Sequence, residues 1–515
     1  MTPPAGDVPV ARRGLITVAV VLGPLMQVLD SSIMSVSLHH MQGTLSAAQD
    51  QISWVLTSYL IAVAIMTPLS GVLSGLIGRR RLFLIAIAGF TTASMFSGLS
   101  DSLTELLILR FIQGFFGAAL VPLSQSMLFD VYPREEYGMA MAWWGVGIMF
   151  GPVLGPTLGG YIVEYYSWRW VFFLNLPIGL LAFAMTWVLI PKTRGRRDGP
   201  FGYTGYIMLA LGLVALQLMM DRGQRLDWFS TPEIVIAAGL AALGFYLFAI
   251  NTWTSRRPFI DPAVLKDLNF VVGLVLKALF GVMLLGMLAL VPQFLQNLAG
   301  YPVITTGLVM APRGLATMVA AIIAGRLVRH VDPRRLIAFG MVVAALTMWH
   351  MSTFTPSVTP THIVIVNALQ GIGFGFFFVP LTTATFSTLA PGQRDVGTSL
   401  YALSGNIGKS VGVSVLVAYL VRNSQANHSV LVEYVTPFNK ALAHVPLPEA
   451  WSLTDPAGLA ALNAEIARQA ELIAYINDFR LLSVIVLVCV PLAFLMRNPL
   501  RRVREPGPLD GQEAT

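Results

Sequence analysis

The residues best placed to do chemistry are an acid and a base inside long apolar segments. Asp30 lies in the apolar run 14–38, and Arg110 lies in the run 104–127. At 1.5 Å per residue, both sit roughly 10–12 Å below the same membrane surface. Charged groups at such depth are costly and are functional candidates by default. Matching depth permits an ion pair, in which Asp30 is the candidate proton carrier and Arg110 tunes it.

A structural role for the two residues is the alternative. Arg110 would then donate to backbone carbonyls, and Asp30 would face a local pocket of water. The functional interpretation is favoured because Asp30 is the only carboxylate expected deep inside any span.

Three more cations fall inside later apolar runs. Lys277 lies about 8 residues into its run, Arg313 about 9 and Lys409 about 13. Lys277 can snorkel to the nearer surface, whereas the other two are too deep to do so easily. Without a deep carboxylate in that part of the chain, such cations predict a cavity that attracts anions. The alternative is that backbone carbonyls or bound water satisfy each cation.

A stretch rich in glycine and proline occupies the fifth apolar run. Four of its glycines recur at every fourth residue, so on a helix they line one side and let a neighbouring backbone approach closely. Its two prolines each remove a backbone donor and are expected to bend the helix. The residues are Gly147, Gly151, Pro152, Gly155, Pro156, Gly159 and Gly160. At the least, they predict a tight contact between two helices.

The elements that must position these residues are membrane-spanning helices. The chain of 515 residues is 55% hydrophobic and only 11% charged, whereas a soluble domain carries about twice that charge. Mean hydropathy is +0.70. Segments of roughly 20 apolar residues cross a bilayer, and fourteen candidates are found. They are 14–38, 53–75, 82–99, 104–127, 138–163, 170–190, 203–220, 232–252, 269–292, 304–325, 336–354, 361–388, 396–420 and 479–496.

Basic residues are distributed unevenly between the two sets of connecting loops. One set, which includes both termini, holds 22 Lys and Arg residues, and the opposite set holds 6. The positive-inside rule therefore predicts that both termini are cytoplasmic. The same rule accounts for the net charge of +7, so no nucleic-acid partner is expected.

An internal repeat relates the two ends of the chain. The pattern Arg110-x-x-Gln113-Gly114 returns 257 residues later as Asn367-x-x-Gln370-Gly371. Parallel repeats of this kind are typical of transporters. The all-α chain is thus expected to form two six-helix halves, 1–200 and 256–515, separated by two extra spans in 201–255. A receptor or membrane enzyme has no need of such a repeat.

One connection, 421–478, is much longer than the others and is predicted to lie outside the membrane. Within it, Leu459, Leu462, Ile466 and Ile473 fall on one side of a helix. We expect an amphipathic helix that rests on the outer surface.

Polar, aromatic and basic residues inside the spans are candidates for lining a substrate cavity, because aromatic and polar side chains together form adaptable pockets. The candidates are Gln113, Trp143, Trp144, Asn175, Arg313, Gln370, Phe377 and Lys409. For most of the aromatic residues, the favoured alternative is that they face lipid or fill space between helices. The sequence contains no P-loop, metal-ligand cluster or nucleophile elbow, so no ATPase, cofactor or metal is expected. Transport would be driven by an ion gradient or be passive.

Several motifs resemble those of one transporter family. Leu29-Asp30-Ser31-Ser32-Ile33 is similar to the first-span motif of the drug:proton antiporters with fourteen spans, and Arg110-x-x-Gln113-Gly114 is similar to their fourth-span motif. The stretch from Gly147 to Gly160 resembles their antiporter motif, G-x-x-x-G-P-x-x-G-G, with Pro156 as a departure. In the loop after span two, Gly75 stands where the family has Asp. The family's charge relay at that loop is therefore not expected here.

The resemblance extends along nearly the whole chain and includes the EmrB-type multidrug exporters of the major facilitator superfamily. It implies proton-coupled export of amphipathic drugs by alternating access in the bacterial inner membrane, with Asp30 and Arg110 in proton coupling. It further implies a periplasmic adaptor of the EmrA type and an outer-membrane channel as partners. The alternatives are a metabolite importer or facilitator on the same fold and a non-transporting membrane enzyme or sensor.

Overall fold

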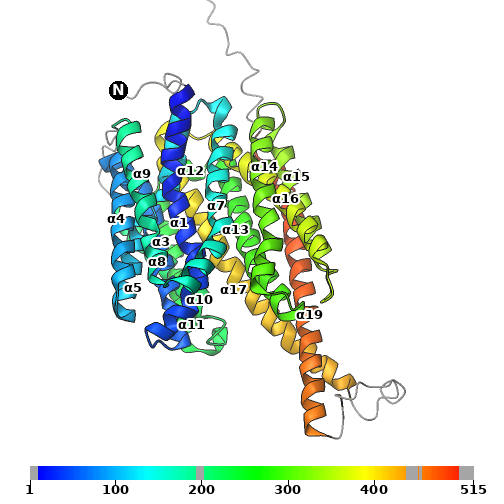
Figure 1. The fold of residues 1–515 in the computed structure, drawn as a ribbon. Helices are drawn as coiled ribbons and strands as arrows, with labels where there is room; N and C mark the ends of the chain where they lie inside the picture. Colours follow the sequence, from blue (N-terminus) through cyan, green and yellow to red (C-terminus); the bar gives the residue numbers. More distant parts are fainter. Residues whose placement is uncertain (1–9, 193–201, 436–450, 452–454, 498–515) are drawn as a thin grey trace, which may run out of the picture.

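The computed structural model describes residues 10–192, 202–435, 451 and 455–497, apart from a few side chains inside these ranges, that of Pro156 among them. The secondary structure described is helical throughout (Figure 1). The first group of helices comprises α1 (Val10–Thr44), α2 (Gln49–Ile52), α3 (Trp54–Ile77), α4 (Arg79–Leu99), α5 (Leu103–Gly117), α6 (Leu120–Val131), α7 (Tyr137–Tyr165), α8 (Arg169–Phe173) and α9 (Asn175–Leu189). We refer to α1–α9 as the N-terminal half.

Two further helices and a second group follow. The extra helices are α10 (Tyr203–Arg222) and α11 (Pro232–Thr254). The second group, which we call the C-terminal half, comprises α12 (Pro262–Leu265), α13 (Leu268–Gln293), α14 (Val303–Leu327), α15 (Pro333–Met351), α16 (Pro360–Ser387), α17 (Arg394–Tyr434), α19 (Pro456–Cys489) and α20 (Leu492–Leu495). A π-helical turn, η3 (Phe294–Leu298), extends α13. Short 3₁₀ turns are η1 (Arg134–Glu136), η2 (Trp228–Ser230) and η4 (Pro391–Gln393).

The helices match the predicted membrane spans in number and order. Thirteen helical stretches of the described residues are long and apolar enough to cross a bilayer. Helix α15, at 19 residues, occupies the position of the remaining predicted span and begins with Pro333, Arg334 and Arg335. The predicted run 104–127 is divided into α5 and α6, which together form one span.

The glycines of α7 pack tightly against α1. A Cβ atom added to Gly147, Gly151, Gly155 or Gly159 would come within 2.2 to 2.7 Å of an α1 side chain. Nothing lies within 4 Å of the equivalent position at Gly160. Helix α7 runs unbroken through Pro152. The predicted tight helix contact is thus confirmed, and its partner is α1, the helix that carries Asp30.

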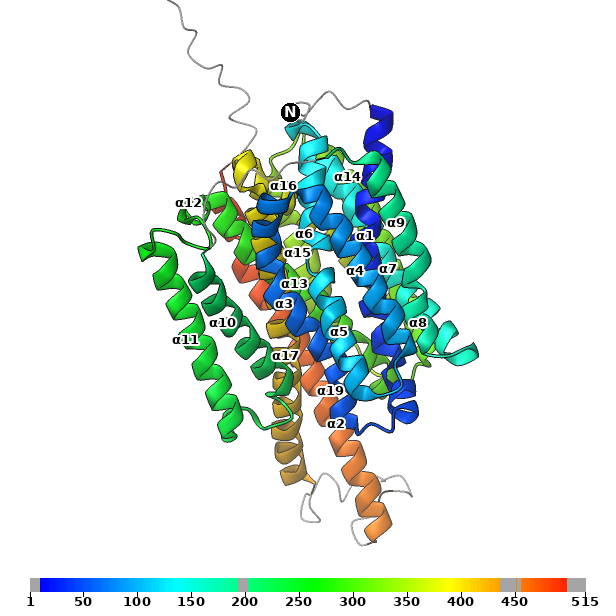
Figure 2. The ribbon, with the colours of Figure 1, turned by 90° about the vertical axis from the view of Figure 1, so that its left-hand side faces the viewer.

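The extra helices lie beside the junction of the two halves. Helix α10 packs on α3 of the N-terminal half and on α17 of the C-terminal half, and α11 packs outside α10 (Figure 2). The Thr57 hydroxyl of α3 donates to Asp221 of α10 at 2.6 Å. The Ser410 hydroxyl of α17 donates to Gln217 of α10 at 2.9 Å. Helix α10 is therefore hydrogen-bonded to both halves.

The long connection 421–478 differs from its prediction. Residues up to Tyr434 continue α17, which is 41 residues long, and residues from Pro456 belong to α19, which also forms the last span. Both helices extend beyond the rest of the bundle at the end away from the N-terminus (Figure 1). The amphipathic segment is helical, but it does not rest on the surface. It packs along α17 instead, because its apolar face buries Leu462 and Ile466 there.

Candidate functional site

An ion pair between α1 and α5 lies at the centre of the N-terminal half. Nη1 of Arg110 donates to Oδ2 of Asp30 at 2.8 Å, and both side chains have no exposed surface. In a dry interior, either charge alone would be strongly destabilised, so each one needs the other. The ion pair permitted by matching depth therefore forms.

Two amides complete the shell around the carboxylate. Nε2 of Gln113 donates to Oδ1 of Asp30 at 3.0 Å, and Nδ2 of Asn175 donates to the same oxygen at 2.9 Å. Asn175 begins α9 and also donates to Ser94 of α4 at 3.0 Å. The carboxylate and its three donors therefore join three spans, α1, α5 and α9, and Asn175 links them to α4.

The guanidinium of Arg110 is held from the other side by α3 and α8. Its Nε donates to the carbonyl of Val55 at 3.3 Å, and its Cζ lies 4.4 Å from the centre of the Tyr59 ring. Its Nη2 has no hydrogen-bond partner among the described residues. A proton that reaches Asp30 would weaken its attraction to Arg110, and Nη2 is a donor already available for another partner.

In the C-terminal half, the position that corresponds to Tyr59 is occupied by Arg313. A Cβ atom on Gly114 would meet the backbone of Tyr59, and one on Gly371 would meet the backbone of Arg313. Arg313 therefore occupies the place of Tyr59. Its Nη1 lies 3.5 Å from Oε1 of Gln370, and no carboxylate of the described chain pairs with it.

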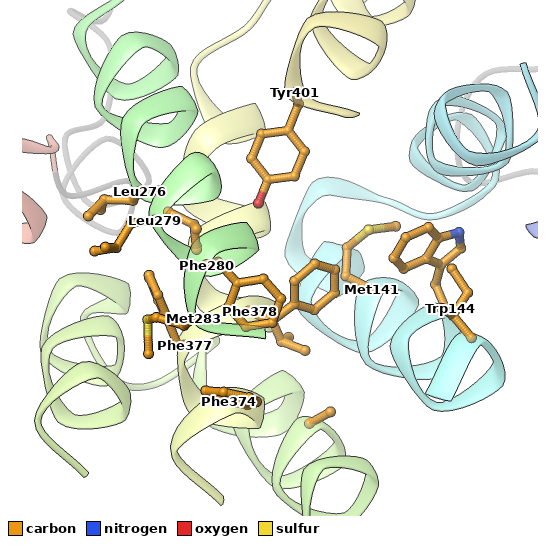
Figure 3. Packing of buried hydrophobic residues seen from close by; sticks show 14 of the residues in the cluster. Met141, Trp144, Leu276, Leu279, Phe280, Met283, Phe374, Phe377, Phe378 and Tyr401 are labelled. Carbon is orange, nitrogen blue, oxygen red and sulfur yellow. The ribbon is translucent and has the colours of Figure 1, made fainter. Parts of the chain in front are cut away.

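A second cluster lies where the two halves meet. The ammonium of Lys277 lies 5.3, 4.6 and 5.0 Å from the ring centres of Phe280, Phe378 and Tyr401, within the range of cation–π attraction. Trp144 of α7 stacks on Phe378 with ring centres 5.7 Å apart. Figure 3 shows Phe378 between the α13 side chains and Trp144, with the Tyr401 hydroxyl directed toward the same group. The cluster thus joins α7 to α13, α16 and α17.

Lys409 belongs to the same region. A Cβ atom on Gly405 would lie 2.8 Å from Cε of Lys277, and Lys409 follows Gly405 by one helical turn. Its Nζ lies 3.5 Å from Oδ1 of Asn406. The expectation that Lys277 snorkels to a surface is wrong, because three rings of its own half surround its ammonium.

The remaining cavity candidates do not form one group. Gln113 and Asn175 bind Asp30, Trp144 joins the aromatic cluster, and Gln370 accompanies Arg313. Phe377 is fully buried beside Phe280, with ring centres 5.5 Å apart. Trp143 is 47% exposed on α7.

Charged residues link the two halves at the end of the bundle that holds the first and last described residues, which we call the terminal end. Nε of Arg79 donates to Asp395 of α17 at 2.6 Å, and Arg79 also pairs with Asp130 of α6. Arg394 of α17 reaches Asp130 at 3.5 Å. Glu136 binds Arg13 at 3.3 Å and Arg329 at 3.4 Å. The sequence around Gly75 did not predict this network, because the acids of the network come from α6, η1 and α17.

Asp30 is not the only buried carboxylate of the described chain. Asp478 of α19 has no exposed surface, and neither of its oxygens has a hydrogen-bond partner among the described residues. The expected boundary of the last span at residue 479 placed Asp478 just outside the membrane.

Comparison with known proteins agrees with this architecture. The family model of the Major Facilitator Superfamily matches residues 20–413. The chain is 33% identical over 495 residues to multidrug export protein EmrB of Escherichia coli (strain K12), covering 95% of this chain and 96% of that protein. It is 33% identical over 494 residues to fatty acid resistance protein FarB of Neisseria gonorrhoeae, covering 95% and 97%.

A solved structure shares the fold at low sequence identity. The proton:xylose symporter XylE superposes with a TM-score of 0.59 at 15% identity, covering 96% of this chain and 99% of that one. The comparisons place the chain among transporters rather than enzymes. It is a multi-pass membrane protein of the major facilitator superfamily and belongs with the EmrB-type multidrug export proteins.

Proposed function

We propose that the protein exports amphipathic compounds of weakly acidic or neutral character in exchange for protons, by alternating access across the bacterial inner membrane. Both termini would lie on the cytoplasmic side, as the distribution of basic residues indicates. The observation that carries the proposal is the fully buried Asp30–Arg110 ion pair. When a carboxylate held in this way gains a proton, the ion pair and hydrogen bonds of its neighbours change.

The coupling step is a change of partner. When a proton from water binds Asp30, the carboxyl becomes neutral and loses most of its attraction for Arg110. Arg110 can then turn its free Nη2 toward another acceptor. Because Gly151 and Gly155 of α7 hold α1 at close range on either side of Asp30, a shift of α1 would be passed to α7. We assign the glycine face of α7 this mechanical role.

The substrate site is proposed to lie around Lys277 and Lys409. No carboxylate of the described chain pairs with either ammonium, and both are partly exposed beside the aromatic cluster. Rings bind the apolar part of an amphipathic molecule, and uncompensated cations favour an acidic group. The name of the relative FarB, a fatty acid resistance protein, agrees with this substrate class.

A periplasmic adaptor of the EmrA type, together with an outer-membrane channel, is the proposed partner. The extensions of α17 and α19 offer a docking surface, because they project beyond the bundle at the end opposite the terminal end (Figure 1). Val430, Val432 and Leu459 are exposed there. Deleting about 450–475 should reduce resistance in cells and release the adaptor in co-purification. Survival of both would exclude this surface as the dock.

The test of function uses everted membrane vesicles with an imposed proton gradient and a panel of acidic, neutral and cationic lipophilic compounds. We expect the wild-type protein to release protons from the vesicle lumen as acidic compounds enter it. Asp30→Asn should abolish gradient-driven flux. It also leaves Arg110 buried without its partner, so flux and substrate binding are compared at equal amounts of folded protein, and binding should remain measurable. Gradient-driven flux in the opposite direction would identify an importer, and full resistance in the Asp30→Asn strain would remove Asp30 from the mechanism.

A further inference from the structure

Asp478 is a buried titratable group that the proposed mechanism does not use. It has no exposed surface, and both of its oxygens lack a hydrogen-bond partner within the described residues. Burying an ionised carboxylate without donors or water is strongly unfavourable. Asp30 avoids this cost with three donors, whereas Asp478 has no donor among the residues that the structure describes. A neutral, protonated carboxyl would avoid this cost at Asp478.

The surroundings of Asp478 are unusual for a packed helix. The π-turn η3 lies against α19 on both sides of this residue, because the ring of Phe294 contacts Tyr475 at 5.6 Å and Phe479 at 6.2 Å between centres. The Tyr475 hydroxyl lies 3.5 Å from Oε1 of Gln293, at the end of α13. A π-turn leaves the regular hydrogen-bond ladder and is frequent at functional sites. This contact between α13 and α19 is thus a natural place for rearrangement.

Charged and titratable groups on the helices packed nearby have other partners or form no ion pair with Asp478. On α19, Arg480 points to Ser352 of α15 and lies over Trp349, and Glu471 and Tyr475 precede Asp478 by about two turns and one turn. Arg422 and His428 lie on α17, and His428 contacts Asn463. His350 of α15 and His362 of α16 contact each other. Within the described chain, no basic side chain forms an ion pair with Asp478.

We propose that Asp478 is a second proton-binding site, located in the C-terminal half, and that its protonation stabilises the conformation in which the halves are linked at the terminal end. The site binds a proton from water when movement of α19 against η3 hydrates it: an O–H bond forms on the carboxylate as one breaks in hydronium. Burial then requires that the proton stay. Ionisation of Asp478 accordingly favours the other conformation of the transport cycle.

The sign of the effect follows from this preference. The conformation described here retains the proton, so acid favours it and alkali disfavours it. Between the ionisation ranges of the two conformations, their ratio changes by up to about tenfold per pH unit. This regulation would add to the proposed exchange at Asp30, but its measurement does not depend on transport.

The experiment follows the distance between the halves as pH changes. Spin labels are placed on cysteines introduced at Arg134 of η1 and Gly392 of η4, both exposed at the terminal end, after Cys489→Ser removes the natural thiol. Pulsed electron resonance on the full chain in lipid nanodiscs then reports the population of the linked conformation. We expect the short-distance population to rise as pH falls.

Three variants decide the outcome. Asp478→Asn mimics the protonated carboxyl and should keep the short distance at high pH, while Asp478→Glu should restore a titration. Glu471→Gln, which neutralises a neighbouring acid on the same helix, should behave as wild type. The comparison is repeated with Asp30→Asn to remove any contribution from that carboxyl. If Asp478→Asn retains the pH dependence of the wild type, or if the wild type shows none, the proposal fails even where proton-coupled export is found.

Discussion

The two halves of the molecule treat buried charge in opposite ways. In the N-terminal half, the one buried guanidinium at the centre meets a carboxylate, and amides complete the shell of the pair. In the C-terminal half, Arg313, Lys277 and Lys409 have no carboxylate partner within the described chain, while the acid Asp478 is buried apart from them. Related helices thus provide a balanced pair in one half and unbalanced cations in the other. The first arrangement suits an internal proton exchange, and the second suits binding of an anion from outside.

Removal of the balancing charge in the N-terminal half should have the largest effect. Arg110→Gln leaves Asp30 buried with its amide donors only, and breaking a buried pair in this way costs about 3–5 kcal/mol. We expect low yield of folded protein in a thermal-stability assay and complete loss of gradient-driven flux. The double variant Asp30→Asn with Arg110→Gln removes both charges and should recover yield but not coupling. Equal yields of the single and double variants would show that Arg110 does not offset the cost of burying the charge of Asp30.

Removal of a cation from the C-terminal half should have a milder and more selective effect. Lys277→Met keeps a long, unbranched side chain among the rings of Phe280, Phe378 and Tyr401 but removes the charge. Folding should be preserved, because no buried partner is left unpaired. Binding of an acidic lipophilic compound should weaken about tenfold, which is about 1.4 kcal/mol, and binding of a neutral analogue should not. Lys409→Gln should act in the same direction.

The outcome that would contradict this assignment is equal loss of acidic and cationic substrates. Strong export of lipophilic cations by the wild-type protein would likewise show that the cations of the C-terminal half do not face the substrate. Arg313→Gln serves as a comparison, because Arg313 lies beside Gln370 and not among the three rings.

Glycine substitutions provide a smaller test of how rigidly each half is packed. Gly155→Ala would place a methyl 2.5 Å from Cβ of Ser32 on α1, so the helices must separate at a cost of about 1–3 kcal/mol. Gly405→Ala would meet only the far end of the Lys277 side chain, which can move. We expect a clear drop in melting temperature for the first variant and little for the second. Gly160→Ala, next to open space, is the matched control.

The smallest expected effect concerns the contact of the extra helices with the N-terminal half. Thr57→Val removes the donor to Asp221 and should cost about 1 kcal/mol. Ser410→Ala removes the corresponding contact with the C-terminal half. Unequal effects of the two variants on stability would show which half holds α10 more firmly. A thermal-stability assay of the two purified variants provides the readout, as the shift in melting temperature.

The sequence predicted the fold and the ion pair because both depend on simple depth and periodicity. Fourteen apolar runs and equal depths of Asp30 and Arg110 are read directly from residue counts. The cluster around Lys277 was not predictable in this way, because its rings come from α13, α16 and α17, and their rotation about the helix axes is set by packing. Asp478 was missed for a different reason. Its helix begins well before the apolar stretch, and hydropathy started the predicted span at residue 479, one residue after Asp478.

The network at the terminal end shows a further limit of reasoning from motifs. Gly75 removes the acid that the family pattern requires, and the pattern alone therefore predicts no charge relay. Arg79 nevertheless finds Asp130 and Asp395 on other helices. Charge pairing at an interface depends on which acidic side chains lie close in space. A local motif describes only the acid within its own loop.

The position of α10 bears on the route by which oily compounds reach the protein from the bilayer. One boundary between the halves, where α3 meets α17, is covered by α10 and α11 (Figure 2). The other boundary, where α7 meets α14, has no such cover among the described helices. A molecule dissolved in the lipid leaflet would thus meet α10 and α11 at one boundary, and α7 and α14 themselves at the other. Although the two halves are similar, the two extra helices make the lipid-facing surface of the protein different at its two boundaries.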